Sequence, residues 1–135
     1  MQNFVLDYSE APVIDFNTEE KLKMRSKKQI SASFQLDDDN FEIFTHGKDV
    51  FIKFYANWCT HCKNLAPIWL ELAQEYQGQF AEVDGNAQYE LSQKFGVKGY
   101  PTLFILKANG ERINYTGERT KESIREFWLS NANKN

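Results

Sequence analysis

The spacing of hydrophobic and polar residues changes near residue 30 of the chain. Residues 1–30 hold a few apolar positions and then a long polar stretch in which acidic residues precede basic ones. This charge order suits a helix and its dipole, but few apolar side chains are available to pack such a helix against a core. We therefore expect residues 1–30 to be an N-terminal extension or linker with partial helical content. An arm that docks a partner protein is the alternative.

From residue 31 onward, segments with a strand pattern alternate with segments in which apolar residues recur every three or four positions. The order predicts an α/β domain at residues 31–131, with a mixed central sheet and helices on both faces, followed by a short tail at 132–135. The expected strands are 31–36, 50–55, 80–83, 101–106 and 112–115, and the expected helices are 41–45, a helix from the cysteines to Gly78, 86–95 and 120–129.

Composition narrows the class of protein. The chain has 135 residues, of which 41% are hydrophobic and 15% aromatic, so one compact domain with a substantial core is expected. The net charge is −3, which argues against a nucleic-acid partner. No apolar run approaches the roughly 20 residues that span a bilayer, and we expect no membrane insertion. Neither a leader pattern nor a retention signal is visible at the termini, so we expect either a cytosolic protein or a piece of a longer precursor.

The chain has two cysteines, Cys59 and Cys62, between a predicted buried strand and a predicted helix. A cysteine at a helix N-terminus lies beside unpaired backbone N–H groups and the positive end of the helix dipole, which stabilise its thiolate. We expect Cys59 to be the exposed nucleophile and Cys62 to be sheltered and able to resolve a mixed disulfide. His61 adds a hydrogen-bond donor or cation beside them. This arrangement predicts thiol–disulfide exchange.

The same residue types could also form other kinds of site. A structural zinc site needs about four ligands, and the chain offers only the two cysteines, His61 and the distant His46. An inert disulfide closing so short a loop would gain little stability. The acidic residues 37–39 are more typical of a helix cap than of a cation site. We therefore expect neither a metal nor an organic cofactor.

Three segments resemble the catalytic thioredoxin-type domain of protein disulfide isomerases: Tyr55-Ala56-Asn57-Trp58-Cys59-Thr60-His61-Cys62-Lys63, Leu65-Ala66-Pro67 and Gly99-Tyr100-Pro101-Thr102. The resemblance covers about residues 31–130. It implies the thioredoxin fold, residence in the lumen of the endoplasmic reticulum, and oxidation or isomerisation of disulfides in cysteine-containing client proteins. Glutathione or an upstream oxidase would be the redox partner. The histidine before the second cysteine is typical of isomerases, whereas reducing thioredoxins usually carry proline there.

The resemblance also assigns roles to single residues. Pro101 matches a cis-proline where an extended substrate pairs with the backbone, so the Tyr100–Pro101 bond is expected to be cis. Trp58 matches a tryptophan that offers apolar surface to clients, with shielding of the disulfide as the alternative. Arg119 matches an arginine that swings toward the second cysteine, or it is a surface arginine at a helix start. Thr60 replaces the family's usual glycine and places a branched side chain near the substrate.

Lys53 is the main departure from this pattern, because many family members hold a buried glutamate or aspartate there as a proton acceptor. Lysine occurs at this place in the multi-repeat thioredoxin-domain proteins of the endoplasmic reticulum, which this chain also resembles. Lys53 is either a base with a lowered pKa or a cation that favours a thiolate on Cys62. We predict that Lys53→Glu raises the rate of disulfide exchange. Two other functions stay open: a thioredoxin-like reductase, and a client-binding module in which Trp58 and Tyr100 act while the cysteines stay idle.

Overall fold

In a computed structural model of the protein, the described residues are 33–133. The extension predicted at 1–30, the first residues of the strand predicted at 31–36 and the last residues of the tail lie outside this range. Within it, five strands form one sheet in the order β2-β4-β3-β5-β6. Their bounds are β2 Phe34–Leu36, β3 Val50–Tyr55, β4 Phe80–Asp84, β5 Thr102–Leu106 and β6 Arg112–Tyr115.

The sheet is mixed, as predicted. Strands β2, β4 and β3 are mutually parallel, while β5 and β6 add to β3 as an antiparallel pair. The nearly continuous apolar run of β3 has its physical reason in this topology, because β3 is paired on both edges and covered on both faces. The Asn109-Gly110 signal correctly predicted the hairpin between β5 and β6.

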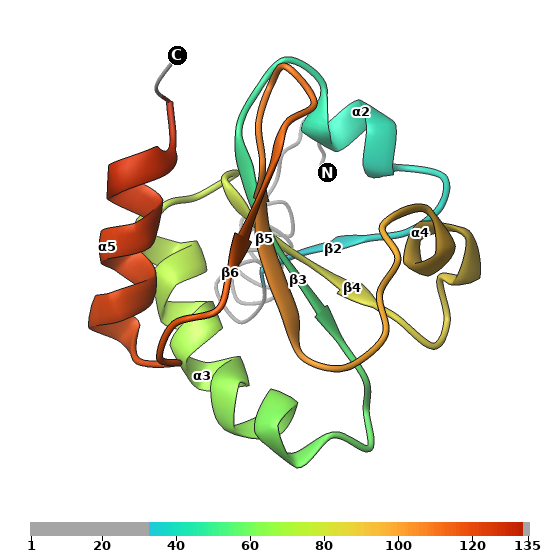
Figure 1. Ribbon diagram of the computed structural model, residues 1–135, viewed down its shortest axis with the longest axis horizontal. Helices are drawn as coiled ribbons and strands as arrows, with labels where there is room; N and C mark the ends of the chain where they lie inside the picture. Colours follow the sequence, from blue (N-terminus) through green and yellow to red (C-terminus); the bar gives the residue numbers. More distant parts are fainter. Residues whose placement is uncertain (1–32, 134–135) are drawn as a thin grey trace, which may run out of the picture. The chain divides into compact units, whose positions relative to one another are not determined.

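In the described part of the chain, four helices cover the two faces of this sheet (Figure 1). Helices α3 and α5 lie on one face, and the shorter α2 and α4 lie on the other. Their bounds are α2 Phe41–Thr45, α3 Thr60–Glu75, α4 Tyr89–Lys94 and α5 Lys121–Asn131. None of these helices, over residues 33–133, is long and apolar enough to cross a membrane.

Helix α4 is shorter than the predicted helix at 86–95. The side chain of Asp84 accepts hydrogen bonds from the backbone N–H groups of Asn86 and Ala87 at 3.1 and 3.3 Å, and its carbonyl accepts from Ala87 and Gln88. These bonds hold the chain after β4 in a turn, and the helix begins only at Tyr89.

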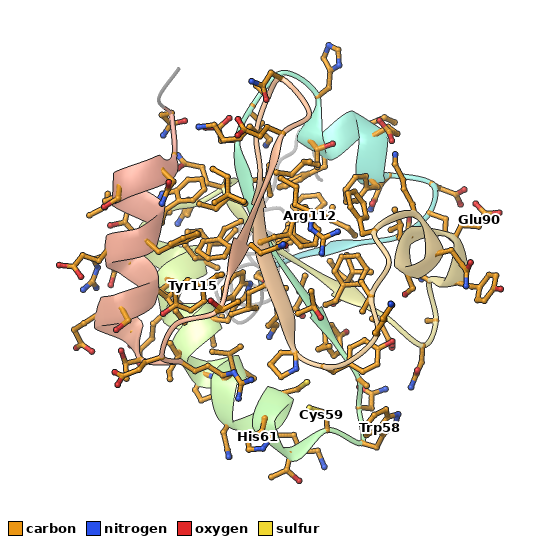
Figure 2. All side chains as sticks on the ribbon, in the orientation of Figure 1. Trp58, Cys59, His61, Glu90, Arg112 and Tyr115 are labelled. Carbon is orange, nitrogen blue, oxygen red and sulfur yellow. The ribbon has the colours of Figure 1, made fainter. Side chains whose placement is uncertain are left out.

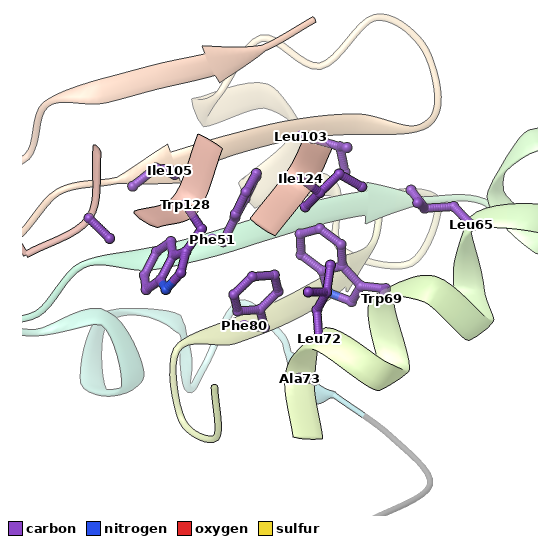
Figure 3. Packing of buried hydrophobic residues seen from close by; sticks show 11 residues of the cluster. Phe51, Leu65, Trp69, Leu72, Ala73, Phe80, Leu103, Ile105, Ile124 and Trp128 are labelled. Atoms are coloured by element: carbon purple, nitrogen blue, oxygen red, sulfur yellow. The ribbon is translucent and has the colours of Figure 1, made fainter. Parts of the chain in front are cut away.

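The face under α3 and α5 is filled by large aromatic side chains (Figure 3). Phe51 of β3 lies edge-on to Trp69 of α3 with ring centroids 5.1 Å apart, and Phe80 of β4 packs against Trp128 of α5 at 5.3 Å. The indole N–H of Trp69 also donates to the carbonyl of Ala81 at 3.2 Å. Helix α3 is thereby held along β3 and β4, which fixes the position of its N-terminus.

On the other face, two of the acidic residues at 37–39 accept hydrogen bonds from backbone N–H groups in different parts of the chain. Asp37 accepts hydrogen bonds from the backbone N–H groups of Asp39 and Asn40, in the turn that leads into α2. Asp38 instead accepts from the backbone N–H of Leu91 in α4 at 3.2 Å, while its own N–H donates to the side chain of Gln88. Asp37 therefore holds the turn before α2, which has no side-chain cap hydrogen bond, and the predicted capping role falls to Asp38, which acts on α4.

Candidate active site

The two cysteines lie where β3 passes into α3. Strand β3 ends at Tyr55 and α3 begins at Thr60, so four residues connect them. Figure 2 shows Trp58, Cys59 and His61 together at this end of the molecule, beyond the carboxyl end of β3. A helix that starts here directs its free N–H groups at whatever group occupies this end of the sheet.

Cys59 is the N-cap residue of α3. Its backbone is extended (φ −89°, ψ 115°), and its Sγ accepts a hydrogen bond from the backbone N–H of Cys62 at 3.1 Å. The same sulfur donates to the carbonyl oxygen of Tyr100 at 3.6 Å. The sulfur therefore contacts a helix N-terminus, the position that favours a thiolate.

The expectation that Cys59 is exposed is wrong, because only 5% of the residue is accessible to solvent. Cys59 packs with Ala56 and Cys62, and Tyr100 packs against this cluster from a loop 41 residues further along the chain. Local reasoning places Cys59 at the outer end of the helix, but the loop that contains Tyr100 covers it.

Cys62 is buried one turn into α3, and both cysteines are free thiols. Burial raises the pKa of the Cys62 thiol to about 11, and the hydrogen bond and the charge of Cys59 act in the same direction. A backbone hydrogen bond from Ala56 and the positive charge of Lys53 act in the opposite direction. Cys62 is therefore protonated at neutral pH and needs help to become a thiolate.

Lys53 is almost completely buried in β3, and its partner is Glu82. The two residues are directly opposite each other in the parallel β3–β4 register, and Nζ of Lys53 lies 3.3 Å from Oε1 of Glu82. The ammonium also lies 5.4 Å from the ring centre of Tyr55 and 5.8 Å from that of Trp69. Tyr55 packs against the cysteine cluster, so this ion pair lies beneath α3 on the side of Cys62.

Glu82 is not among the residues that the sequence pattern predicted for this site. A signal was present, because Lys53 is the one charged residue of β3, and Glu82 lies between apolar residues of β4, ahead of the Asp84 that ends this strand. Two such residues of opposite sign on neighbouring strands indicate a buried pair.

Trp58 and Tyr100 form an aromatic surface beside Cys59. Trp58 is 68% exposed, and its ring lies edge-on to that of Tyr100 with centroids 5.8 Å apart. The Tyr100–Pro101 peptide bond is cis, as expected from the resemblance. Cys59 is thus flanked by aromatic rings and by the backbone of the Pro101 loop.

The other predicted residues lie at the edge of this site. Thr60 and His61 are exposed in the first turn of α3. Arg119 is exposed before α5 and makes no hydrogen bond or ion pair with any described residue, so the structure does not bring it to Cys62. His46 follows α2, which packs on the other face of the sheet. Across residues 33–133, no three side chains of metal-binding type come together.

Comparison with known proteins identifies this arrangement. The family model described as Thioredoxin matches residues 32–130. Protein disulfide-isomerase of Datisca glomerata is 44% identical over 96 residues, which are 68% of this chain and 19% of the relative. Protein disulfide-isomerase A4 of Rattus norvegicus is 39% identical over 103 residues, which are 72% of this chain and 16% of the relative. The chain therefore spans about a fifth of the length of the curated relatives that it matches.

Two solved structures extend the comparison. The J-Trx1 fragment of ERdj5 has a TM-score of 0.67 and 33% identity, covering 72% of this chain and 50% of that one. The first thioredoxin domain of mouse protein disulfide-isomerase A4 has a TM-score of 0.64 and 35% identity, covering 75% of this chain and 77% of that one. The predicted thioredoxin fold and the resemblance to protein disulfide isomerase domains are confirmed.

Proposed function

Because the chain belongs to the thioredoxin family, we propose that it is a thiol–disulfide oxidoreductase that oxidises or isomerises disulfide bonds in client proteins. The observation that carries this proposal is the position of Cys59. Its sulfur contacts a free N–H at the start of α3 and the carbonyl of Tyr100, and Cys62 lies within the same turn. The names of the relatives, protein disulfide-isomerases, support the same chemistry.

In the oxidising direction, a client thiolate attacks Sγ of Cys59 in the Cys59–Cys62 disulfide. The bond between the two sulfurs breaks, and Cys62 leaves as a thiolate and takes up a proton. The client's second thiolate then attacks the client sulfur of the mixed disulfide, and Cys59 leaves as a thiolate. Two electrons pass from the client to the enzyme. The high pKa of Cys62 favours its protonated form after the first step.

In the isomerising direction, the thiolate of Cys59 attacks a wrong client disulfide and releases one client thiolate. That thiolate, or another one in the client, then attacks the client sulfur of the mixed disulfide. A new client disulfide forms and Cys59 leaves as a thiolate, with no net transfer of electrons. When the complex stalls, Cys62 loses its proton and attacks Cys59, which releases a reduced client. This escape step requires Cys62 to give up its proton first, and the raised pKa of Cys62 opposes that.

The surrounding residues have supporting roles in this proposal. The charge of Lys53 favours the thiolate of Cys62, and His61 provides a donor near the exposed end of α3. Trp58, Thr60, Tyr100 and Pro101 form the surface that meets the client, with the backbone beside Pro101 pairing with an extended segment. Arg119 reaches Cys62 only if the loop before α5 moves.

The proposed setting is the lumen of the endoplasmic reticulum, with glutathione or an upstream oxidase as the electron partner. The resemblance to protein disulfide isomerases supports this setting. The exchange uses the two cysteines and needs no cofactor.

The reduction potential of the Cys59–Cys62 pair, measured in glutathione buffers, tests the direction of the reaction. Protein disulfide isomerase lies near about −180 mV and thioredoxin near about −270 mV, a gap worth roughly 4 kcal/mol for two electrons. We expect a value near the first, since His61 rather than proline precedes Cys62. A value near the second would indicate a reductase and would overturn the proposed compartment.

Cysteine variants, assayed for the oxidation and refolding of a client protein, separate catalysis from client binding alone. Cys59→Ala removes the nucleophile and should abolish both reactions. Cys62→Ala keeps the nucleophile and should accumulate mixed disulfides with the client, which dithiothreitol reduces. If Cys59→Ala retains full effect on client folding, the domain is a binding module and the proposed chemistry is wrong.

A further inference from the structure

Gly85, directly after β4, lies against the ring of Tyr100 more closely than any other residue type would allow. A Cβ atom built on Gly85 would lie 2.3 Å from Cε1, 2.5 Å from Oη and 2.7 Å from Cζ of that ring. Real Cβ atoms essentially never make contacts below 3.0 Å. The backbone of Gly85 is therefore part of the surface on which Tyr100 rests.

The backbone of Gly85 is held on both sides. Its N–H donates to the carbonyl of Tyr55 at 2.8 Å, and its carbonyl accepts from the hydroxyl of Ser92 at 2.8 Å. These bonds tie it to the end of β3 and to α4. If a methyl group were added at Gly85, the outer end of the Tyr100 ring would have to move, because the glycine backbone is fixed.

The Tyr100 ring is also one half of the aromatic surface beside Cys59. It lies edge-on to the exposed ring of Trp58 at 5.8 Å, and the carbonyl of the same residue accepts from Cys59. The ring and the carbonyl are separable, because a side chain can rotate while its backbone stays in place. Moving the ring would change the aromatic surface and leave the contact with Cys59.

We propose that Gly85 is a positioning residue that seats the Tyr100 ring against Trp58 and so sets the preference for clients with apolar side chains next to their cysteines. This inference rests on the proposed function. Gly85 itself does not touch the client. Edge-to-face aromatic contacts and apolar burial at such a surface are worth enough to alter affinity several-fold.

The test compares Gly85→Ala with Gly99→Ala. Gly99 precedes Tyr100 and receives the same added methyl, but a Cβ atom at Gly99 would meet no atom within 4 Å outside its two chain neighbours, so it is a matched control for a methyl added beside Tyr100. Each oxidised protein is given two dithiol peptides, one with leucine and one with serine beside each cysteine. Peptide oxidation transfers two electrons to Cys59–Cys62, and glutathione disulfide regenerates the enzyme disulfide.

For Gly85→Ala we expect KM for the leucine peptide to rise about 3- to 10-fold. We expect kcat, KM for the serine peptide and the rate of exchange with glutathione to stay at wild-type values. Gly99→Ala should match the wild type throughout. In a Tyr100→Ala background, Gly85→Ala should have no further effect on KM, because the ring that it displaces is gone.

Equal KM values for the leucine peptide in Gly85→Ala and Gly99→Ala would overturn the inference and leave the proposed function intact. A wild-type protein that oxidises neither peptide would overturn the proposed function. If Gly85→Ala fails to fold, NMR of the wild-type protein still tests the premise that the Tyr100 ring lies against Gly85. Nuclear Overhauser contacts between the α-protons of Gly85 and the ring protons of Tyr100 are expected, and their absence would contradict the proposal.

Discussion

Cys62 has a thiol that its surroundings keep protonated. Burial, together with the hydrogen bond and the charge of Cys59, raises the pKa of the Cys62 thiol to about 11, so the thiol is protonated at pH 7. The ammonium of Lys53 opposes this, but Lys53 is itself paired with Glu82 at 3.3 Å. The rate of any step that starts from the Cys62 thiolate therefore depends on the charges and the proton acceptors of the buried Lys53–Glu82 pair.

Exchanging the two members of the pair tests that dependence. A carboxylate at position 53 can accept the proton of Cys62, which a lysine ammonium cannot, so we expect Lys53→Glu to speed exchange with glutathione disulfide about tenfold or more. The single change also places two carboxyl groups side by side and should reduce the free energy of unfolding by about 2 kcal/mol. The double change Lys53→Glu with Glu82→Lys restores the opposite charges.

The double variant should therefore be fast without the loss of stability, as measured by stopped-flow fluorescence and urea unfolding. Slower exchange in both variants would mean that the ammonium's attraction for the thiolate matters more than proton transfer.

At the scale of elements, the N-termini of α3 and α4 are capped in different ways. The cap of α3 comes from the residue just before the helix, and that of α4 comes from a distant loop. Helix α3 is capped by Cys59, so the reactive sulfur takes the position that Ser, Thr, Asp or Asn usually occupies. Helix α4 has no side-chain cap of its own, and Asp38, 53 residues earlier, accepts from Leu91 in its place. The loop before α2 thereby stabilises α4.

Removing this cap should weaken the domain without touching the cysteines. Asp38→Ala is expected to lower the free energy of unfolding by about 1 kcal/mol, because the N–H of Leu91 loses its acceptor. Asp39→Ala is the control, since the side chain of Asp39 makes no hydrogen bond or ion pair with any described residue. Equal losses of stability in urea for the two variants would show that the bond to Leu91 contributes nothing.

At the scale of the whole molecule, Asp49 links several elements at the end of β3 that lies away from the cysteines. Its carboxylate pairs with Nζ of Lys107 at 2.7 Å and accepts from the backbone N–H groups of Ala108 and Asn133. Lys107 also donates to the carbonyl of Asn131 at 2.6 Å. The start of β3, the end of β5 and the end of α5 meet at one buried ion pair.

This pair should make the stability of the protein depend on acid pH. Burial raises the pKa of Asp49, but the hydrogen bonds from Lys107, Ala108 and Asn133 and the charge of Lys107 outweigh it, so the pKa is lowered overall. A lowered pKa in the folded state means that the stabilisation is complete above the unfolded-state value of about 3.9 and is lost as the pH falls through the folded-state value.

We expect Asp49→Asn to lower the free energy of unfolding by about 2–4 kcal/mol at pH 7, because it leaves Lys107 buried without its counter-charge. The difference from wild type should shrink below about pH 4. Urea unfolding across this pH range measures both effects, and the reduction potential of the cysteines should not change. A difference that is constant with pH would contradict the role given to the Asp49 carboxylate.

The parts that could be predicted from sequence are those that depend on neighbours in the chain. The Cys59–Cys62 spacing at a strand-to-helix junction indicated thiol chemistry, because a helix N-terminus acts on the residue that caps it. The strands and the hairpin followed from apolar patterns and from Asn109-Gly110. By contrast, the partner of Lys53 depends on the register of two parallel strands, and the acceptor for Leu91 lies 53 residues away.

The amino-acid order alone was therefore sufficient for the fold class, the family resemblance and the reactive pair, since these depend on local hydrogen bonding and on the period of apolar residues. Only the folded chain decided that Tyr100 covers Cys59, that Glu82 neutralises Lys53 and that Gly85 supports the Tyr100 ring. The reason is physical: each of these contacts joins segments that are distant in the chain, and their side chains meet only after the sheet has set its register and the loops have packed around it.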